Sequence, residues 1–169
     1  MSGDRSKLKQ PDRTVAFVED SSPMTSDCVF CSLLNGEASA EWVWRAPAAS
    51  ALLPRRDGWL APGHTLVISN EHAVGVQDVP SGCLQEVALL VQRVAQQMAA
   101  TMGAVGVNVL NVSGPNSDQS VDHLHFHVVP RWPDDGLDTW VHGTSSHEAA
   151  AGWLDDLRAG LSATASDLS

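Results

Sequence analysis

Three histidines lie two residues apart in the stretch DHLHFHVVP, residues 122–130, and an apolar residue follows each of them. Side chains of a β-strand alternate between the two faces of a sheet, so this spacing places His123, His125 and His127 on one face. The apolar residues between them then point to the other face, where a protein core needs them. Three imidazoles in register on one face therefore indicate a functional site.

Two kinds of chemistry fit three histidines on one strand face. Same-face neighbours lie roughly 6–7 Å apart, a distance that several ligand sets around a metal ion can bridge. A neutral imidazole can also attack an electrophile, while flanking imidazoles supply protons or hydrogen bonds near pH 7. A solvated face that carries histidine by chance is a third alternative, although threonine, lysine or glutamate would be usual there. The spacing alone leaves metal binding and catalysis both open.

The cysteines offer a second candidate site. The chain has three, Cys28, Cys31 and Cys83, and an odd number without a signal peptide argues against a disulfide framework. The C-V-F-C pair differs from a redox dithiol, which usually opens a helix after a β-strand, because no strand is expected before it. The pair is either two buried free thiols or half of a zinc site that needs two further ligands.

The hydrophobic pattern predicts the elements that position these residues. A short helix starts with Asp27 as N-cap and runs through CVFCSLLN to Gly36. A long amphipathic helix covers 82–102 and stops at Gly103. Strands are expected at 41–45, 50–54, 65–69, 105–112 and 121–129, the last of them ended by Pro130. This order predicts an α+β domain on a mainly antiparallel, five-stranded sheet.

The chain length of 169 residues is typical of one domain. Residues 1–25 are polar and carry no periodic pattern, so we expect a flexible N-terminal extension. The catalytic domain is expected over 26–145. A C-terminal tail, 146–169, is expected to be partly helical, with a weak helix near 147–160.

The net charge of −10 argues against large anionic partners. It repels duplex nucleic acid and anionic membrane surfaces, so neither is an expected partner. A small anionic ligand is compatible with this net charge, because a few local hydrogen-bond donors can bind a phosphate. No apolar run reaches membrane-spanning length and the N-terminus lacks the apolar stretch of a secretion signal, so we expect a cytoplasmic protein.

Three blocks of the sequence resemble the histidine triad (HIT) superfamily of nucleotide hydrolases and transferases, in its bacterial zinc-binding form. HLHFHVV is similar to the family signature of three histidines alternating with apolar residues, within DQSVDHLHFHVVPRW. CVFCSLLNGE resembles the opening segment of the family, and APGHTLVISNEH resembles its Pro-Gly-His segment. The blocks follow the family order over about residues 28–140. The resemblance implies the HIT-like fold.

The resemblance also implies catalytic roles. The middle histidine, His125, would attack the α-phosphorus of a nucleotide derivative and form a nucleotidyl-histidine intermediate. His127 would hold the phosphoryl oxygens, and Ser120 and Gln119 match positions that donate hydrogen bonds to the phosphate or the leaving group. His64 corresponds to a further histidine near the active site, although a structural role in its loop is an equal alternative.

For the cysteine pair, the resemblance implies a closed structural zinc site. Some bacterial relatives bind zinc with the two cysteines, the last histidine of the Pro-Gly-His segment and the first histidine of the triad. The matching positions here are Cys28, Cys31, His72 and His123, and all four are suitable ligands. Such a zinc ion would join the N-terminal segment to the triad strand and stabilise the fold without taking part in catalysis.

The sequence departs from the family pattern at positions that contact the substrate. Many relatives place a ribose-binding aspartate where this chain has Arg56, and Asp57 follows one residue late. Asn111 lies one residue before the family's Asn-x-Gly asparagine, whose slot holds Val112, and Asp118 replaces the glycine before Gln-Ser. The candidate substrate-binding residues are therefore Arg56, Asp57 and Asn111. These departures leave the identity of the preferred substrate open.

The resemblance favours a nucleotidyl hydrolase or transferase that acts on a phosphoramidate-type conjugate. Cleavage of a dinucleoside polyphosphate is the alternative within this class. A nucleotide-binding module with weak or lost catalysis, and a hydrolase with a catalytic metal at the triad, are alternatives from other classes. A nucleotide or nucleotide conjugate is the expected partner, and a homodimer is expected by analogy.

Overall fold

The computed structural model describes residues 28–138 and 145–163. The chain divides into two compact units, Met1–Leu137 and Asp138–Ser169, which are described separately. The expected N-terminal extension 1–25 lies outside the described residues, as does Asp27. The N-cap of the first helix is Cys28, so the expectation of Asp27 as N-cap is wrong. The first unit ends close to the expected domain boundary at 145, which stays a prediction.

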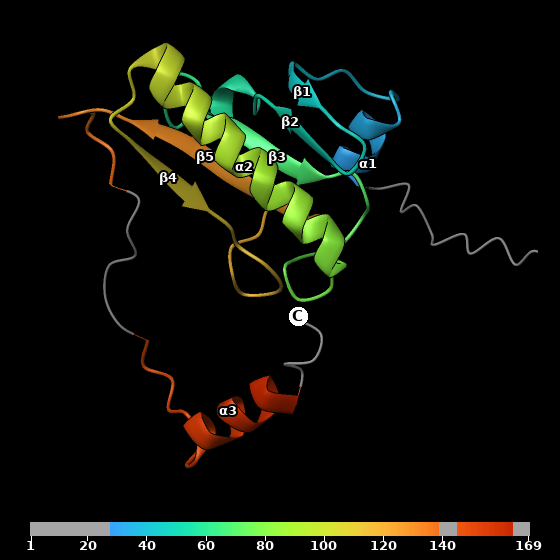
Figure 1. Cartoon of the computed structure of the whole chain (residues 1–169), viewed down its shortest axis with the longest axis vertical. Coiled ribbons are helices and arrows are strands. Elements are labelled where there is room, and N and C mark those ends of the chain that lie inside the picture. The colour runs from blue at the N-terminus through green and yellow to red at the C-terminus, as the bar shows by residue number, and fades with distance from the viewer. Residues whose placement is uncertain (1–27, 139–144, 164–169) are drawn as a thin grey trace, which may run out of the picture. The chain divides into compact units, whose positions relative to one another are not determined.

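A five-stranded antiparallel sheet forms the first unit, in the spatial order β1-β2-β3-β5-β4 (Figure 1). Each neighbouring pair of strands is antiparallel. The strands are β1 (Trp42–Arg45), β2 (Ala49–Leu52), β3 (Thr65–Ser69), β4 (Gly106–Leu110) and β5 (His125–Arg131). The α+β fold with five antiparallel strands is therefore confirmed, with β1 and β4 as the two edges.

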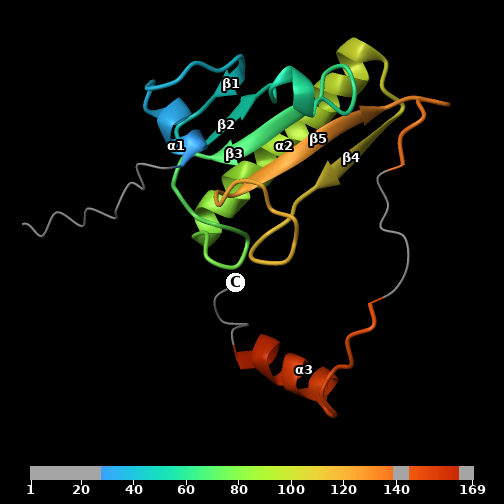
Figure 2. The same cartoon turned by 180° about the vertical axis from the view of Figure 1, so that it is seen from behind.

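The two faces of the sheet carry two different cores. Helix α2 (Ser81–Met102) crosses one face and packs on alternate strand residues such as Val67 and Val128. Helix α1 (Val29–Leu34) packs with Leu66 and Ile68, whose side chains point to the opposite face (Figure 2). The predicted long helix is confirmed, and Gly103 ends it in the left-handed conformation, with φ of 64°.

Strand β5 differs from the predicted strand at both of its ends. It begins at His125 rather than at residue 121, so His123 lies in the chain segment that leads into the strand. It also continues through Pro130, which was expected to end it. The carbonyl of Arg131 accepts a hydrogen bond from Val105 beside β4, so the adjacent Pro130 nitrogen faces the β3 side. Pairing with β3 has already ended at Val128, and the missing N–H therefore breaks no strand hydrogen bond.

The second unit contains one helix, α3 (Trp153–Ala163), which starts and ends later than the helix expected near 147–160. Four of its large apolar side chains are exposed, namely Trp153, Leu154, Leu157 and Leu161. Across the described residues, every helix is too short or too polar to span a lipid bilayer.

Two adjacent leucines of α2 test the packing of this helix on the sheet. Leu90 is 7% exposed and belongs to the core, whereas Leu89 is 46% exposed. We expect Leu90→Ala to lower the free energy of unfolding by about 2–5 kcal/mol, because it leaves a cavity. The matched control Leu89→Ala should change it by less than about 0.5 kcal/mol. Urea denaturation measures both, and equal effects would contradict this helix orientation.

Candidate functional site

Four side chains form a cluster that can bind a metal ion. The ligand atoms of Cys28, Cys31, His72 and His123 all lie within 4.8 Å of one another, and three of the residues are buried. The sulfur of Cys28 lies 3.4 Å from Nδ1 of His123, and the sulfur of Cys31 lies 3.3 Å from Nδ1 of His72. Tetrahedral zinc with ordinary bond lengths requires a sulfur–nitrogen separation of about 3.6 Å. The four side chains therefore fit a zinc ion.

The ring of His123 is oriented for metal binding by its second nitrogen. Its Nε2–H donates to the backbone carbonyl of Ser69 at 2.8 Å, and the Ser69 hydroxyl lies 3.3 Å from the same nitrogen. This hydrogen bond leaves Nδ1 with its lone pair facing the two sulfurs. Burial also lowers the pKa of His123, which keeps the ring neutral as a ligand must be.

The Cys31 thiol is held in its neutral form when no cation is bound. Burial, followed by the neighbouring Cys28 side chain, raises the pKa of the Cys31 thiol to about 11. Two thiolates side by side in a buried site repel each other, and a divalent cation between them removes that cost. The donor set, two sulfurs and two neutral imidazoles, is the set that zinc prefers.

His125 lies on the same sheet face as the metal cluster, one step further into β5. Its Nδ1–H donates to the backbone carbonyl of His123 at 2.7 Å, which leaves the lone pair on Nε2. Phe30 lies against its ring with centroids 5.3 Å apart, and Ile68 is its partner residue in β3. These contacts fix both the tautomer and the direction of the ring.

His125 is only 2% exposed, so the residue is buried in this chain taken by itself. No described residue forms a hydrogen bond with its Nε2. Within the described residues, every fully buried side-chain nitrogen or oxygen has a hydrogen-bond partner. Nε2 is therefore the edge of the ring that contacts solvent, and the lone pair lies at the surface of the buried site.

His64 and His127 form a directed chain of hydrogen bonds. The backbone N–H of Leu60 donates to Nδ1 of His64 at 3.2 Å, so the proton of His64 is on Nε2. That Nε2–H donates to Nδ1 of His127 at 2.9 Å. The proton of His127 is therefore on its own Nε2, where it is available as a donor. His64, for which catalytic and structural roles were equal alternatives, thus orients His127.

Both rings of this pair are neutral. Burial lowers the pKa of His64. Burial, together with the neighbouring rings of His125 and His64, lowers the pKa of His127 to about 4. Protonation of His127 at Nδ1 would place two donors opposite each other and break the bond between the rings, whereas protonation of His64 at Nδ1 would break its bond from the Leu60 N–H.

Gly63 of the Pro-Gly-His loop allows the backbone conformation that positions His64. Gly63 has φ of 84°, in the left-handed region that favours glycine. The end of the Met102 side chain lies where a β-carbon would be, so a side chain at this position would collide with α2. The loop therefore approaches the helix more closely than any other residue would allow, and His64 is buried as a result.

Gln119 supports a loop and is not free to bind a phosphate. Its Nε2 donates to the carbonyls of Val74 and Val121 at 2.6 and 2.9 Å, and its Oε1 accepts from the N–H of Gly114 at 2.6 Å. Both of its amide hydrogens are used. The structure thus corrects its expected role as a phosphate donor: Gln119 joins two loops and positions the adjacent Ser120, which is exposed.

Asn111 is close to β5, whereas the other substrate-binding candidates are on a separate loop. The Asn111 amide donates to the backbone carbonyl of His125 at 2.8 Å and accepts from the Ser113 hydroxyl at 2.8 Å. Arg56 and Asp57 are exposed in a short 3-10 helix, Arg56–Gly58. No hydrogen bond between described residues joins this short helix to His125 or His127.

Asp118, where the family pattern has glycine, has a left-handed backbone. Its φ is 62°, and nearby Asn116 has φ of 63°. Asparagine and aspartate are the residues that tolerate this left-handed conformation best after glycine. The aspartate therefore fits this backbone and adds a charge to the loop.

Sequence reasoning missed Ser69 and Phe30. Ser69 supplies the carbonyl that orients His123, and Phe30 contacts the rings of both His123 and His125. A backbone carbonyl leaves no signal in the residue type. Phe30 had a signal, its place between the two cysteines, since a metal cluster at the triad brings every residue of that turn near the histidines.

The HIT domain family model matches residues 36–134, more than half of the chain. An uncharacterized HIT-like protein of Mycoplasma pneumoniae is 30% identical over 81% of this chain and 94% of its own length. Another, MG132 of Mycoplasma genitalium, is 33% identical over 64% of this chain and 75% of its own.

Solved structures share the fold of this chain. A zinc-bound histidine triad family protein from Mycobacterium smegmatis is 33% identical, covers 67% of this chain and 81% of its own, and has a TM-score of 0.63. A protein from Leishmania major is 26% identical, covers 83% and 97%, and has a TM-score of 0.70. The histidine rings, the loop glycine and the family match lead to one conclusion: this chain belongs to the HIT family.

Proposed function

We propose that this protein is a nucleotidyl hydrolase or transferase that acts at the α-phosphate of a nucleotide conjugate, with phosphoramidates as its first substrate class. The observation that carries the proposal is the hydrogen bond from Nδ1–H of His125 to the His123 carbonyl, which leaves a lone pair on Nε2 at the solvent edge. A neutral imidazole in this state is a nucleophile without any prior loss of a proton.

In the proposed first step, Nε2 of His125 bonds to the α-phosphorus and the bond from phosphorus to the leaving nitrogen breaks. The leaving amine takes a proton from solvent by way of the exposed Ser120 hydroxyl. The Nε2–H of His127 holds a phosphoryl oxygen and keeps its proton, because His64 fixes its tautomer. Water then attacks phosphorus, its proton leaves to solvent, and the bond to His125 breaks.

A covalent adduct tests the nucleophile directly. When the protein is mixed with a nucleoside phosphoramidate and quenched in the cold, we expect the mass of a nucleotidyl group on the peptide that contains His125. His125→Ala should abolish the adduct and lower turnover by at least about 10³-fold. The control His147→Ala, in the second unit, should leave both unchanged. Tight nucleotide binding without any adduct would identify a binding module instead, and an adduct from dinucleoside polyphosphates alone would change the substrate class.

We propose that the metal of the four-residue cluster is zinc and that its role is structural. When bound, the ion would hold Cys28 and Cys31 of the α1 segment to His123, next to the catalytic strand, and supply stability rather than reaction chemistry. The neutral charge of two thiolates with one zinc ion suits a buried site.

Metal content and melting temperature check the zinc proposal. We expect about one zinc per chain, bound at four protein ligands. Cys28→Ser should lose the ion and lower the melting temperature by on the order of 10 °C. The control Cys83→Ser, whose thiol is outside the cluster, should keep both. Turnover that persists in the zinc-free variant at low temperature would support a structural role, and its loss with the fold intact would contradict it.

The neutral state of His127 has a consequence for stability. Its pKa is about 4 in the folded protein, below the usual 6.5, so the unfolded chain binds more protons between these values. The contribution of His127 to stability is present above pH 6.5 and is lost as the pH falls toward 4. We expect His127→Asn to reduce the pH dependence of the unfolding free energy over pH 4–6.5 by about 1 kcal/mol per unit. Denaturation at several pH values measures the slope, and an unchanged slope would show that the ring is protonated in the fold.

We propose a homodimer formed at the β4 edge of the sheet. Val105 and Val109 are exposed there, although they are large and apolar. An exposed apolar strand at a sheet edge favours pairing with a second copy. The opposite edge of the sheet, at β1, presents different residues on its surface.

A further inference from the structure

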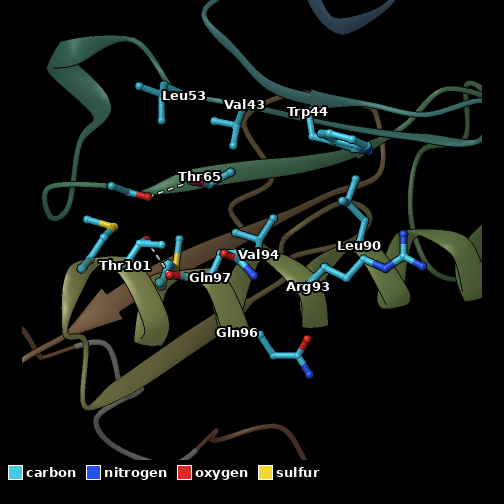
Figure 3. A pocket seen from close by; sticks show the side chains of 13 residues that line it. Val43, Trp44, Leu53, Thr65, Leu90, Arg93, Val94, Gln96, Gln97 and Thr101 are labelled. Carbon is cyan, nitrogen blue, oxygen red and sulfur yellow. Dashed lines mark hydrogen bonds between the residues drawn. The ribbon is translucent and has the colours of Figure 1, made fainter.

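A groove of about 570 Å³ lies between the β1 edge of the sheet and α2 (Figure 3). Helix α2 supplies its floor, where Leu90, Val94 and Met98 are buried in the core. Strand β1 supplies the other wall with Val43 and Trp44. The groove is on the opposite side of the sheet from the histidines, because its residues belong to the α2 face.

The groove exposes more apolar surface than an edge strand normally does. Trp44 is 58% exposed and Val43 is 48% exposed. Consecutive residues of a strand normally point to opposite faces, but the register of β1 shifts between Trp42 and Trp44. This irregularity lets both side chains line the same groove. A strand edge with two such residues is a surface for another strand to cover.

Among the described residues that line the groove, Arg93 is the one cation. Arg93 of α2 lines the groove next to Leu90, and its side chain is exposed. No carboxylate of the described residues pairs with it. The groove therefore fits a segment that combines apolar side chains with an acidic group.

The chain before Cys28 contains such a segment. Residues 14–18 read TVAFV, a run of apolar and β-branched residues, and Glu19 and Asp20 follow directly. In an extended conformation Val15 and Phe17 share one face, which matches an apolar groove. Nine residues, 19–27, lie between Val18 and Cys28, and the ten steps along the chain can span up to roughly 33 Å. Cys28 begins the α1 segment, which contacts β1 through the hydrogen bond from Arg45 to the Leu34 carbonyl.

We propose that residues 14–20 of this chain dock on the groove, pairing as an added strand with the free edge of β1. Val15 and Phe17 cover Trp44 and the α2 floor, and the two acidic residues lie beside Arg93. The docked segment removes the edge from solvent. The proposal does not depend on the catalytic function.

Hydrogen exchange of the full-length protein tests the docking. We expect Phe17→Asp to speed amide exchange in peptides that cover β1 by at least about fivefold, because an added strand protects the edge it pairs with. The control Ser21→Asp adds the same charge outside the apolar run and should leave exchange unchanged. Unchanged zinc content in both variants verifies that the described core is intact.

A charge reversal tests the pairing with Arg93. Arg93→Glu should speed exchange of β1 as Phe17→Asp does, and adding Glu19→Arg with Asp20→Arg should restore it. The proposal would be overturned if Phe17→Asp left the exchange of β1 unchanged. It would also be overturned if the protection of β1 depended on protein concentration, because that would indicate a second copy of the chain. Loss of protection with Leu157→Asp only would overturn it as well, because that would indicate α3 as the occupant.

Discussion

The site depends on a single kind of constraint, a hydrogen bond that occupies one nitrogen of each functional histidine. The Ser69 carbonyl holds Nε2–H of His123, the His123 carbonyl holds Nδ1–H of His125, and Leu60 together with His64 sets the proton of His127. Each bond decides which nitrogen keeps a lone pair or a proton. Three chemically identical side chains thereby differ in the nitrogen that each one presents: Nδ1 of His123 and Nε2 of His125 carry a lone pair, and Nε2 of His127 carries a proton.

Burial favours the neutral state of these histidine rings, on which their different hydrogen-bonding roles depend. The pKa values of His123, His64 and His127 are all lowered, with burial as the largest cause. Neutral rings are what a metal ligand and a directed hydrogen-bond chain both require. The same burial leaves little of His125 exposed, so a substrate would have to reach the Nε2 edge of its ring.

The loops around the site combine family geometry with residues of this chain's own. Asp118 has a left-handed backbone where the family pattern has glycine, and Gln119 uses its whole amide to join the loop at Val74 to the segment before the triad. Arg56 and Asp57 are set apart on their own exposed turn. The frame that positions Ser120 is therefore preserved, while the surface that would contact a ribose or base is altered.

The sequence by itself determined the strands and the long helix, because hydrophobic periodicity is a local property of the chain. Its motifs indicated, by resemblance, the family and the four residues that cluster as possible metal ligands. The tertiary structure alone decided that His123 lies before the strand, that Pro130 lies within it, and that Gln119 is fully bonded. Those outcomes depend on where β3 ends and on which carbonyls lie nearby, and a residue's type carries no record of partners 30 to 50 positions away.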